Sequence, residues 1–186
     1  MNIIERPISE IGLIAEVSIA FEVHSVIEFS SSENGYIPKE VVTEYPYTKD
    51  YDAIPGNHPG EWSKHFDVSK WGLLIAIEGK KKIGSALIAF DTRNVDMLEG
   101  RRDLAVLWDI RVSPEYRMQG VGKALFEEAK KWAKLHNCTE LKIETQNNNV
   151  GAVNFYLKQG AVLRTIISNA YHELPDECML LFYLTL

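Results

Sequence analysis

Apolar and polar residues follow their most regular pattern after about Ser69, and that pattern first predicts strands. The apolar runs 71–77 and 83–90 are rich in β-forming residues and are separated by the polar break 78–81, which contains Gly79. Two such runs around a short glycine-containing break predict a hairpin of buried strands. A third run, 104–112, predicts another strand, and Pro114 stops sheet pairing just after it.

Residues 121–136 have the period of an amphipathic helix. Apolar side chains recur at steps of three and four, with Glu and Lys on the opposite positions. The apolar positions are Val121, Leu125, Phe126, Ala129, Trp132, Ala133 and Leu135 or His136. Asn137 is suited to the left-handed conformation that ends many helices. We therefore expect a helix that buries one face and stops near Asn137.

The chain beyond this helix predicts one more helix among three strands. Residues 141–145 alternate as a strand, 150–158 predict a helix that ends at Gly160, and 161–170 and 178–186 predict terminal strands. The strand, helix, strand step from 112 to 141 implies one parallel pair in a mostly antiparallel sheet. The expected fold class is α+β or mixed α/β, with helices flanking a central sheet.

The first 70 residues are less regular. Residues 11–29 switch between helical and strand spacing, 30–35 resemble a loop, and 45–60 predict an ordered surface loop with short strands at its edges. No linker rich in Gly, Pro and Ser divides the chain. We expect a single domain (1–186) with a variable acceptor-side part (1–70), a central part (71–161) and C-terminal strands (162–186).

Composition narrows the classes of function. The chain has 186 residues, 46% of them hydrophobic, and 26 acidic against 20 basic residues give a net charge of −6, so a nucleic-acid partner is not expected. Cys138 and Cys178 lie outside any CxxC or His cluster, so neither a disulfide framework nor a metal site is expected, and a reducing cytoplasm is the default location. No apolar run approaches the ~18 residues of a membrane span, so no membrane partner is expected.

The candidate chemistry lies in the turn between the strand 104–112 and the helix 121–136. It reads Arg117-Met118-Gln119-Gly120-Val121-Gly122. Glycines let the main chain approach a ligand closely, and the N–H groups and dipole of a helix N-terminus attract anions. Taken alone, the turn indicates a pyrophosphate cradle or, equally, a tight structural turn. A Walker loop and a Rossmann fingerprint both fit badly, because Lys123 precedes Ala124 and a third glycine is missing.

This turn resembles the acetyl-CoA signature of the GNAT N-acetyltransferase family, Arg/Gln-x-x-Gly-x-Gly/Ala between a strand and a helix. Residues 109–116 resemble the family's central strand and its exit. A second block, 149–156 followed by Gly160, resembles the family's Asn-x-x-Ala-x-x-Phe-Tyr helix. The resemblance covers 71–161 well. Segments 21–23, 108–110, 144–149 and 182–184 are similar, more narrowly, to streptothricin acetyltransferases.

The resemblance implies acetyl-CoA as cosubstrate, held where two parallel strands part, and it implies no metal. Main-chain N–H groups near Ile110 or Val112 would polarise the thioester carbonyl. Asn149 is suited both to contact the pantetheine arm and to cap its helix. The cofactor contacts implied are Ile110, Arg111, Val112, Arg117, Met118, Gln119, Gly120, Val121, Gly122, Lys123, Asn149, Ala152 and Tyr156.

Direct acetyl transfer needs a proton donor for the departing thiolate. The resemblance implies Tyr156 as this general acid, since an ordinary phenol is protonated at neutral pH. Without the family motif, Phe155 and Tyr156 would be interpreted as core aromatics. Cys138, at a helix end, is expected to be a buried structural thiol, so no covalent enzyme intermediate is expected.

The amine also needs a base, and Asp109 and Glu144 are the candidates. Alternation along the strand places Asp109 on the same face as Leu107 and Arg111. Each carboxylate can accept the amine proton directly or through water. Each can instead form a structural ion pair, with Arg111 or Lys142.

The acceptor is constrained only by charge and aromatic content. Acidic residues favour a cationic amine or are simply solvated surface charges, and they are Glu33, Glu40, Glu44, Asp50, Asp52, Asp91, Asp96, Glu99, Asp103 and Glu115. Aromatic residues that can enclose a cation or form core are Tyr36, Tyr45, Tyr47, Tyr51 and Trp62.

The predicted function is acetyl transfer to a primary amine of a small cationic acceptor, with a streptothricin-like antibiotic as the first choice. The alternatives are a protein lysine or N-terminal acetyltransferase and a non-catalytic acyl-CoA-binding sensor. The terminal strand 178–186, if exposed, can pair between subunits, so a homodimer is one arrangement that the sequence allows.

Overall fold

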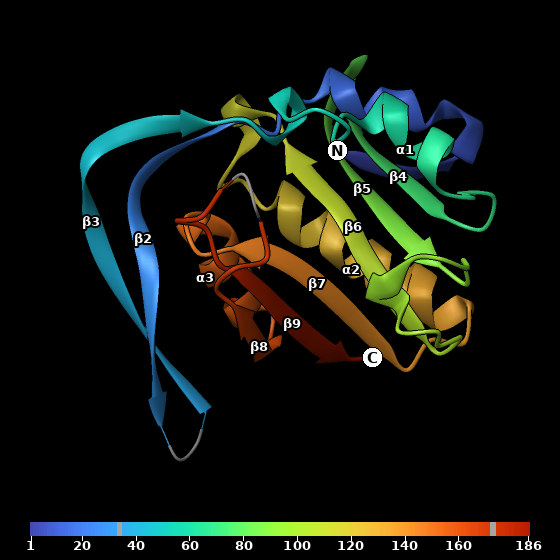
Figure 1. Ribbon diagram of the computed structural model, residues 1–186. Coiled ribbons are helices and arrows are strands. Elements are labelled where there is room, and N and C mark those ends of the chain that lie inside the picture. The colour runs from blue at the N-terminus through green and yellow to red at the C-terminus, as the bar shows by residue number, and fades with distance from the viewer. Residues whose placement is uncertain (33–34, 172–173) are drawn as a thin grey trace. The chain divides into compact units, whose positions relative to one another are not determined.

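The computed structural model describes residues 1–32, 35–171 and 174–186 (Figure 1). These residues group into two compact units. The first comprises 1–20, 50–142 and Leu186, and the second comprises 21–49 and 143–185. The strand β7 (Glu140–Gln146) begins in the first unit and ends in the second.

The first unit is built on a mixed sheet in the order β1-β4-β5-β6, followed by the start of β7. The pairs β1–β4, β4–β5 and β5–β6 are antiparallel, and β6 and β7 form the one parallel pair. The predicted hairpin is confirmed, with Gly79 in a left-handed turn between its strands. The strands are β1 (Asn2–Arg6), β4 (Gly72–Glu78), β5 (Lys81–Phe90) and β6 (Leu104–Val112).

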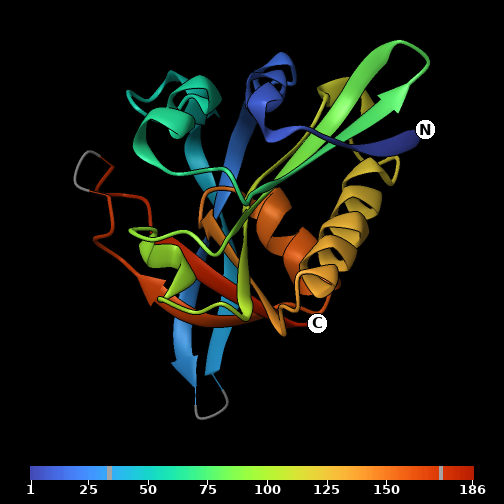
Figure 2. The same cartoon turned by 90° about the vertical axis from the view of Figure 1, so that its right-hand side faces the viewer.

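The predicted amphipathic helix is α2 (Val121–Leu135), which packs on β4, β5 and β6 (Figure 2). Two strand glycines make room for it. A Cβ at Gly72 would lie 2.4 Å from Trp132, and one at Gly84 would lie 2.9 Å from Leu125. Asn137 takes the left-handed conformation predicted for the helix end. The close approach of α2 to the sheet therefore depends on residues without side chains at these two positions.

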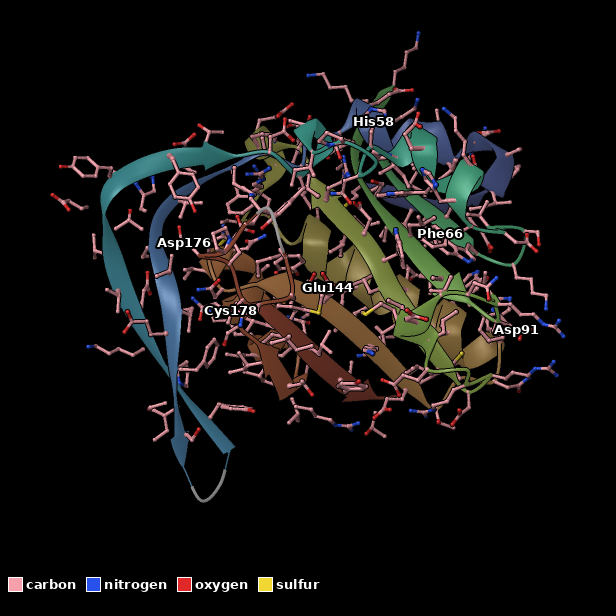
Figure 3. The ribbon with its side chains drawn as sticks, viewed as in Figure 1. His58, Phe66, Asp91, Glu144, Asp176 and Cys178 are labelled. Atoms are coloured by element: carbon pink, nitrogen blue, oxygen red, sulfur yellow. The ribbon has the colours of Figure 1, made fainter. Side chains whose placement is uncertain are left out.

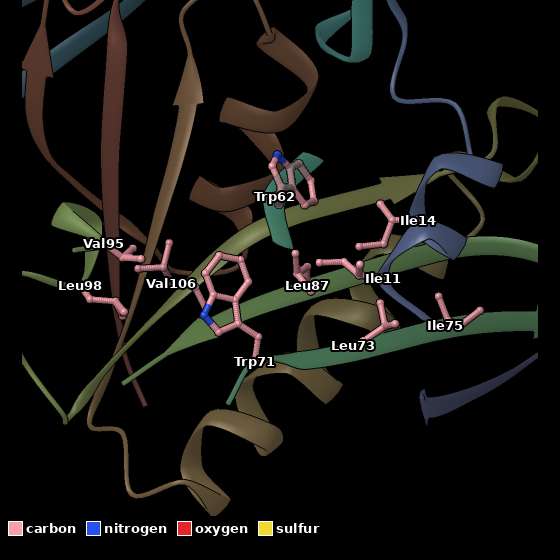
Figure 4. Close-up of a cluster of buried hydrophobic side chains, with 11 residues drawn as sticks. Ile11, Ile14, Trp62, Trp71, Leu73, Ile75, Leu87, Val95, Leu98 and Val106 are labelled. Carbon is pink, nitrogen blue, oxygen red and sulfur yellow. The ribbon is translucent and has the colours of Figure 1, made fainter. Parts of the chain in front are cut away.

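The opposite face of the same strands carries a hydrophobic cluster (Figure 4). Leu73 and Leu87 point to this face because side chains alternate along a strand and Gly72, Gly84 face α2. The segment η1 (Ile8–Glu16) and the helix α1 (Pro59–His65) contribute buried residues to the cluster. Its buried members are Ile11, Ile14, Trp62, Trp71, Leu73, Ile75, Leu87, Ala89, Val95, Leu98 and Val106.

The second unit contains the end of β7 and two further strands in the order β7-β9-β8. The strands β8 (Val162–Ile167) and β9 (Met179–Thr185) pair antiparallel, and α3 (Val150–Lys158) ends at Gly160, which has a φ of +85°. The predicted helix and terminal strands are confirmed. However, β9 lies between β7 and β8, so it is not the exposed strand that pairing between subunits would require.

The prediction for residues 30–60 is largely wrong. The segments β2 (Phe21–Ser32) and β3 (Gly35–Lys49) form a long antiparallel ribbon, and only residues 33 and 34 of the predicted loop lie outside the described residues. Pro38 and Pro46 concealed β3 in the sequence. They are tolerated because β3 has a partner on one side only, so a missing N–H need not break a ladder. The segment η2 (Tyr51–Ala53) and the first residues of α1 occupy part of the remainder.

Short helical segments complete the chain. They are η3 (Asp96–Leu98) before β6 and η4 (Pro114–Tyr116) after it. Over the ranges that the structure describes, no helix combines the length and hydropathy needed to cross a bilayer. Among the same residues, no group of His, Cys, Asp and Glu side chains is arranged to hold a metal ion. The fold class is mixed α/β, as predicted.

Candidate functional site

The predicted phosphate turn joins β6 to α2 in the first unit. After Pro114–Tyr116, Met118 and Gly120 take positive φ angles of 60° and 87°, and the helix begins at Val121. A Cβ at Gly120 would meet nothing within 4 Å, so the space beside this residue is open. No side chain caps the helix, and the first N–H groups of an α-helix lack intrahelical acceptors. The turn thus presents main-chain donors to an anion.

Arg117, the first residue of the signature, is turned back into the first unit. Its Nε donates to the Val112 carbonyl at 3.0 Å and its Nη2 to the Ala20 carbonyl at 2.8 Å. Burial lowers the pKa of Arg117. The guanidinium therefore fastens the turn to the end of β6 through main-chain acceptors.

Asp109 and Arg111, both on β6, lie in a buried ion cluster of the first unit. Arg111 donates to both carboxylate oxygens of Asp109, at 2.9 and 2.6 Å, and to both oxygens of Asp52, at 2.7 and 3.1 Å. A further bond, of 3.1 Å, goes to the Val17 carbonyl. All five N–H donors of this guanidinium are thereby used, which leaves its side chain no donor for a cofactor.

The charges of this cluster affect one another. Burial raises the pKa of Asp109, against the lowering effect of the Arg111 hydrogen bond, and the Asp52 carboxylate adds to the increase. The two carboxylates raise the pKa of Arg111 further above its ordinary value despite burial. The structural ion pair that we considered for Asp109 is therefore present.

The predicted face of Asp109 is wrong in one respect. Leu87 of β5 pairs with Asp109, whereas its neighbour Ile88 pairs with Leu107, so the register shifts at Trp108. Because one extra residue reverses the alternation, Asp109 and Leu107 point to opposite faces. Asp109 does share its face with Arg111, as predicted.

The second predicted block forms the start and body of α3 in the second unit. Asn149 is the N-cap, and its Oδ1 accepts a hydrogen bond from the Ala152 N–H at 3.1 Å. Tyr156 is 5% exposed, with its ring centroid 5.3 Å from that of Phe155 and 6.1 Å from that of Phe182. The capping role of Asn149 is confirmed. The position of Tyr156 agrees with a core aromatic, and its chemical role stays a prediction.

Glu144 lies on β7, in the part of that strand that belongs to the second unit (Figure 3). Its Oε1 accepts a hydrogen bond of 2.7 Å from the hydroxyl of Tyr171, which follows β8. The Nε2 of Gln146 donates to the same hydroxyl at 2.8 Å. We also considered an ion pair between Glu144 and Lys142. In the structure, Lys142 forms an ion pair with Glu99 at 2.8 Å.

The sequence missed Tyr171 and the role of Asp52. Tyr171 stands outside every motif, and no sequence signal relates it to Glu144, because the contact joins segments that are separate in the sequence. Asp52 was recognised only as one of many acidic residues. Each unit brings part of the predicted set together: Asp109, Arg111 and Arg117 on one, and Glu144, Asn149, Ala152 and Tyr156 on the other.

Several of the acidic residues expected to attract a cation are engaged by basic side chains. Asp91 binds Lys70 and Arg102, and Asp103 binds Arg101, which together with Thr139 lowers the pKa of Asp103 to about 2. Glu33 lies outside the described residues. The Asp91 and Asp103 carboxylates therefore form surface ion pairs, which agrees with their interpretation as surface charges.

The aromatic candidates are partly buried and partly exposed. Trp62 belongs to the buried cluster, with its ring 6.3 Å from that of Trp108. Tyr36, Tyr45 and Tyr47 are exposed on β3. Tyr51 is half-buried, so the three rings of β3 are the candidates most open to solvent.

A strand that turns through a glycine into an open helix N-terminus is an arrangement that binds anions. The model of the acetyltransferase (GNAT) family matches residues 39–161, more than half of the chain. The protein therefore belongs to the GNAT acetyltransferase family. The match begins within β3, well before the region in which the motifs are evident.

Curated relatives share part of this sequence. Streptothricin acetyltransferase A of Bacillus subtilis (strain 168) is 37% identical over 71 residues, which are 38% of this chain and 41% of that protein. Streptothricin acetyltransferase of Escherichia coli is 42% identical over 74 residues, 40% of this chain and 42% of that protein. The aligned segment thus spans well under half the length of these relatives.

Two solved structures are similar over nearly the whole chain. One is a Bacillus anthracis str. Ames protein assigned as a streptothricin acetyltransferase, in complex with acetyl coenzyme A. It is 28% identical with a TM-score of 0.73 and covers 100% of this chain and 97% of that one. The other, nourseothricin acetyltransferase, is 20% identical with a TM-score of 0.75, covers 99% of this chain and 97% of that one, and supports the fold.

Proposed function

We propose that this protein transfers the acetyl group of acetyl-CoA directly to a primary amine of a small cationic acceptor, with streptothricin-type antibiotics as the first class to test. The observation that carries the proposal is the turn 117–122, whose uncapped helix N-terminus and unobstructed Gly120 suit a diphosphate. The family match and the acetyl coenzyme A complex of a similar protein support it.

Acetyl-CoA supplies an activated acyl group and a thiolate leaving group. In the proposed site, main-chain N–H groups of the turn and of the first residues of α2 bind the diphosphate. Arg117 contributes indirectly, because its two bonds to main-chain carbonyls hold the turn in place. The side chain of Arg111 is committed to Asp109, Asp52 and Val17, so any contact of Arg111 with the cosubstrate comes from its main chain.

The reaction needs a base and an acid, and we assign one side chain to each role. Glu144 takes a proton from the acceptor ammonium, and the neutral amine then attacks the thioester carbonyl, so that a C–N bond forms as the C–S bond breaks. Tyr156 gives its hydroxyl proton to the thiolate. The nitrogen loses its second proton as the amide forms, and that proton restores the Tyr156 phenol. We propose Glu144 rather than Asp109 as the base, because both oxygens of Asp109 are held by the Arg111 guanidinium.

The test begins with calorimetry of the wild-type protein and acetyl-CoA. Thiol release is then measured with streptothricin, a polyamine, free lysine and a lysine peptide, and products are identified by mass spectrometry. Tyr156→Phe, which keeps the ring and its packing, should lower kcat by on the order of 10²-fold and leave the Kd for acetyl-CoA unchanged.

The other outcomes separate the competing functions. Absence of any affinity for acetyl-CoA would reject the proposal altogether. Binding without turnover on any of the amines would favour the acyl-CoA sensor. Turnover on the peptide alone would favour a protein acetyltransferase. A Tyr156→Phe variant with wild-type kcat would remove Tyr156 as the acid.

A further inference from the structure

Tyr171 lies in a hydrogen-bonded group of three side chains within the second unit. Its hydroxyl donates to Glu144 Oε1 at 2.7 Å and accepts from Gln146 Nε2 at 2.8 Å. Glu144 and Gln146 share one face of β7, since they are two residues apart on a strand. The phenol therefore bridges two neighbouring side chains of that face, from a segment that follows β8.

The direction of the Tyr171 hydrogen bond is fixed by charge. Burial raises the pKa of the Tyr171 phenol above its ordinary value, and the Glu144 carboxylate raises it further. The Gln146 bond opposes this increase, while the more distant Glu177, which is ion-paired with Lys49, adds to it. The phenol consequently keeps its proton across the neutral range and donates it to Glu144.

The two candidate bases differ in what holds them. Asp109 accepts two bonds from a guanidinium that also binds Asp52, so its carboxylate is bound to a permanent cation. Two of the groups that hold Glu144 are neutral, a phenol and, at 3.5 Å, the Gln146 amide. A neutral donor orients a carboxylate and still lets it gain a proton.

We propose that Tyr171 is the positioning residue of the base Glu144. The inference rests on the function proposed above and deepens it. The Tyr171 hydroxyl fixes the rotamer of Glu144 and stabilises its charged form, so that the carboxylate is ionised and correctly aimed when it takes the ammonium proton. Tyr171 keeps its own proton throughout, and no other atom of it takes part in the reaction.

The experiment compares Tyr171→Phe with a matched control, Tyr183→Phe. Tyr183 lies on β9 in the same unit, with its ring beneath the Arg164 guanidinium, and the substitution also removes a single hydroxyl. The readouts are kcat/KM against pH on whichever amine the wild type acetylates, the Kd for acetyl-CoA by calorimetry, and the melting temperature.

Tyr171→Phe should lower kcat/KM about tenfold, since a hydrogen bond to a charged group is lost. It should move the limb that rises with pH toward higher pH, because a carboxylate without that donor is less stable in its charged form. The Kd for acetyl-CoA should stay the same. Glu144→Gln should abolish the rising limb, and the double variant should be no slower than Glu144→Gln alone.

The results that contradict the inference are distinct from those that contradict the function. If the wild type acetylates an amine and Tyr171→Phe has the same pH profile as Tyr183→Phe, Tyr171 is not a positioning residue and the function stands. Additive losses in the double variant would lead to the same conclusion. If the wild type binds acetyl-CoA but acetylates none of the amines, the proposed function fails and the inference fails with it.

Discussion

Arg111 and Arg117 illustrate how a motif residue can be engaged by groups of its own unit. Both were predicted cofactor contacts, yet Arg111 uses all its donors on Asp109, Asp52 and Val17, and Arg117 binds the main chain at Val112 and Ala20. Both guanidinium groups thus hold segments of the first unit together. A sequence reports that a cation is present but not which acceptors will surround it.

The free thiols give a prediction at the same scale. Cys138 is buried, and burial together with the Asp103 carboxylate raises its pKa to about 11. At pH 8 roughly one thiol in a thousand is then ionised, so iodoacetamide should modify Cys138 slowly. The rate of modification should rise about tenfold for each pH unit up to the pKa. Cys178, which is half-buried, should react first.

Peptide mapping by mass spectrometry after timed alkylation measures both rates. Faster modification of Cys138 than of Cys178 at pH 8 in the folded protein would contradict this assignment. Urea-unfolded protein is the control, because both thiols should then react alike.

At the scale of elements, glycines serve two different purposes. Gly84 lets α2 approach β5, since a Cβ there would lie 2.9 Å from both the Arg111 carbonyl and Leu125. Gly120 has a positive φ and open space, so its purpose is the conformation of the turn. One position supports packing and the other the proposed anion site.

Alanine at these two positions should therefore have different effects. Gly84→Ala should lower the free energy of unfolding by about 1–3 kcal/mol through overpacking, because the Arg111 carbonyl cannot move aside as a flexible side chain could. Gly120→Ala should lower it by only about 1 kcal/mol, the penalty of a left-handed residue with a Cβ, and should weaken acetyl-CoA binding. Urea denaturation and calorimetry measure the two quantities. Equal acetyl-CoA affinities for Gly120→Ala and the wild type would argue against the turn as the diphosphate site.

At the scale of the molecule, contacts between distant segments hold each unit together. In the second unit, Lys49 at the end of β3 forms a buried ion pair with Glu177, 128 positions later. Nearby, the Ile27 N–H donates to the Asn147 carbonyl at 2.8 Å, and the Cys178 N–H donates to Asn147 Oδ1 at 2.8 Å. The first two of these contacts join the β2–β3 ribbon to the residues just after β7 and just before β9, and the third joins those two segments to each other. All five residues lie in the second unit.

Removing only the cation of this ion pair should destabilise the protein more than neutralising both partners. Lys49→Met leaves the Glu177 carboxylate buried without this cation and should lower the free energy of unfolding by about 3 kcal/mol. Lys49→Met combined with Glu177→Gln should lose less. Chemical denaturation of the wild type and the two variants tests this coupling, and a double variant less stable than Lys49→Met would contradict it.

The sequence by itself determined the strands and the two longer helices from Gly72 onward, the turn 117–122 and the helix cap at Asn149, because these depend on local periodicity, glycine conformation and short-range hydrogen bonds. Only the tertiary structure decided the β2–β3 ribbon, the reversed face of Asp109 and the partners of Glu144. A ribbon containing prolines has no clear local pattern, a one-residue register shift is invisible until strands pair, and Tyr171 reaches Glu144 only when separate segments meet. Chain-local forces specify what each segment becomes, whereas contacts between segments specify what each side chain can do.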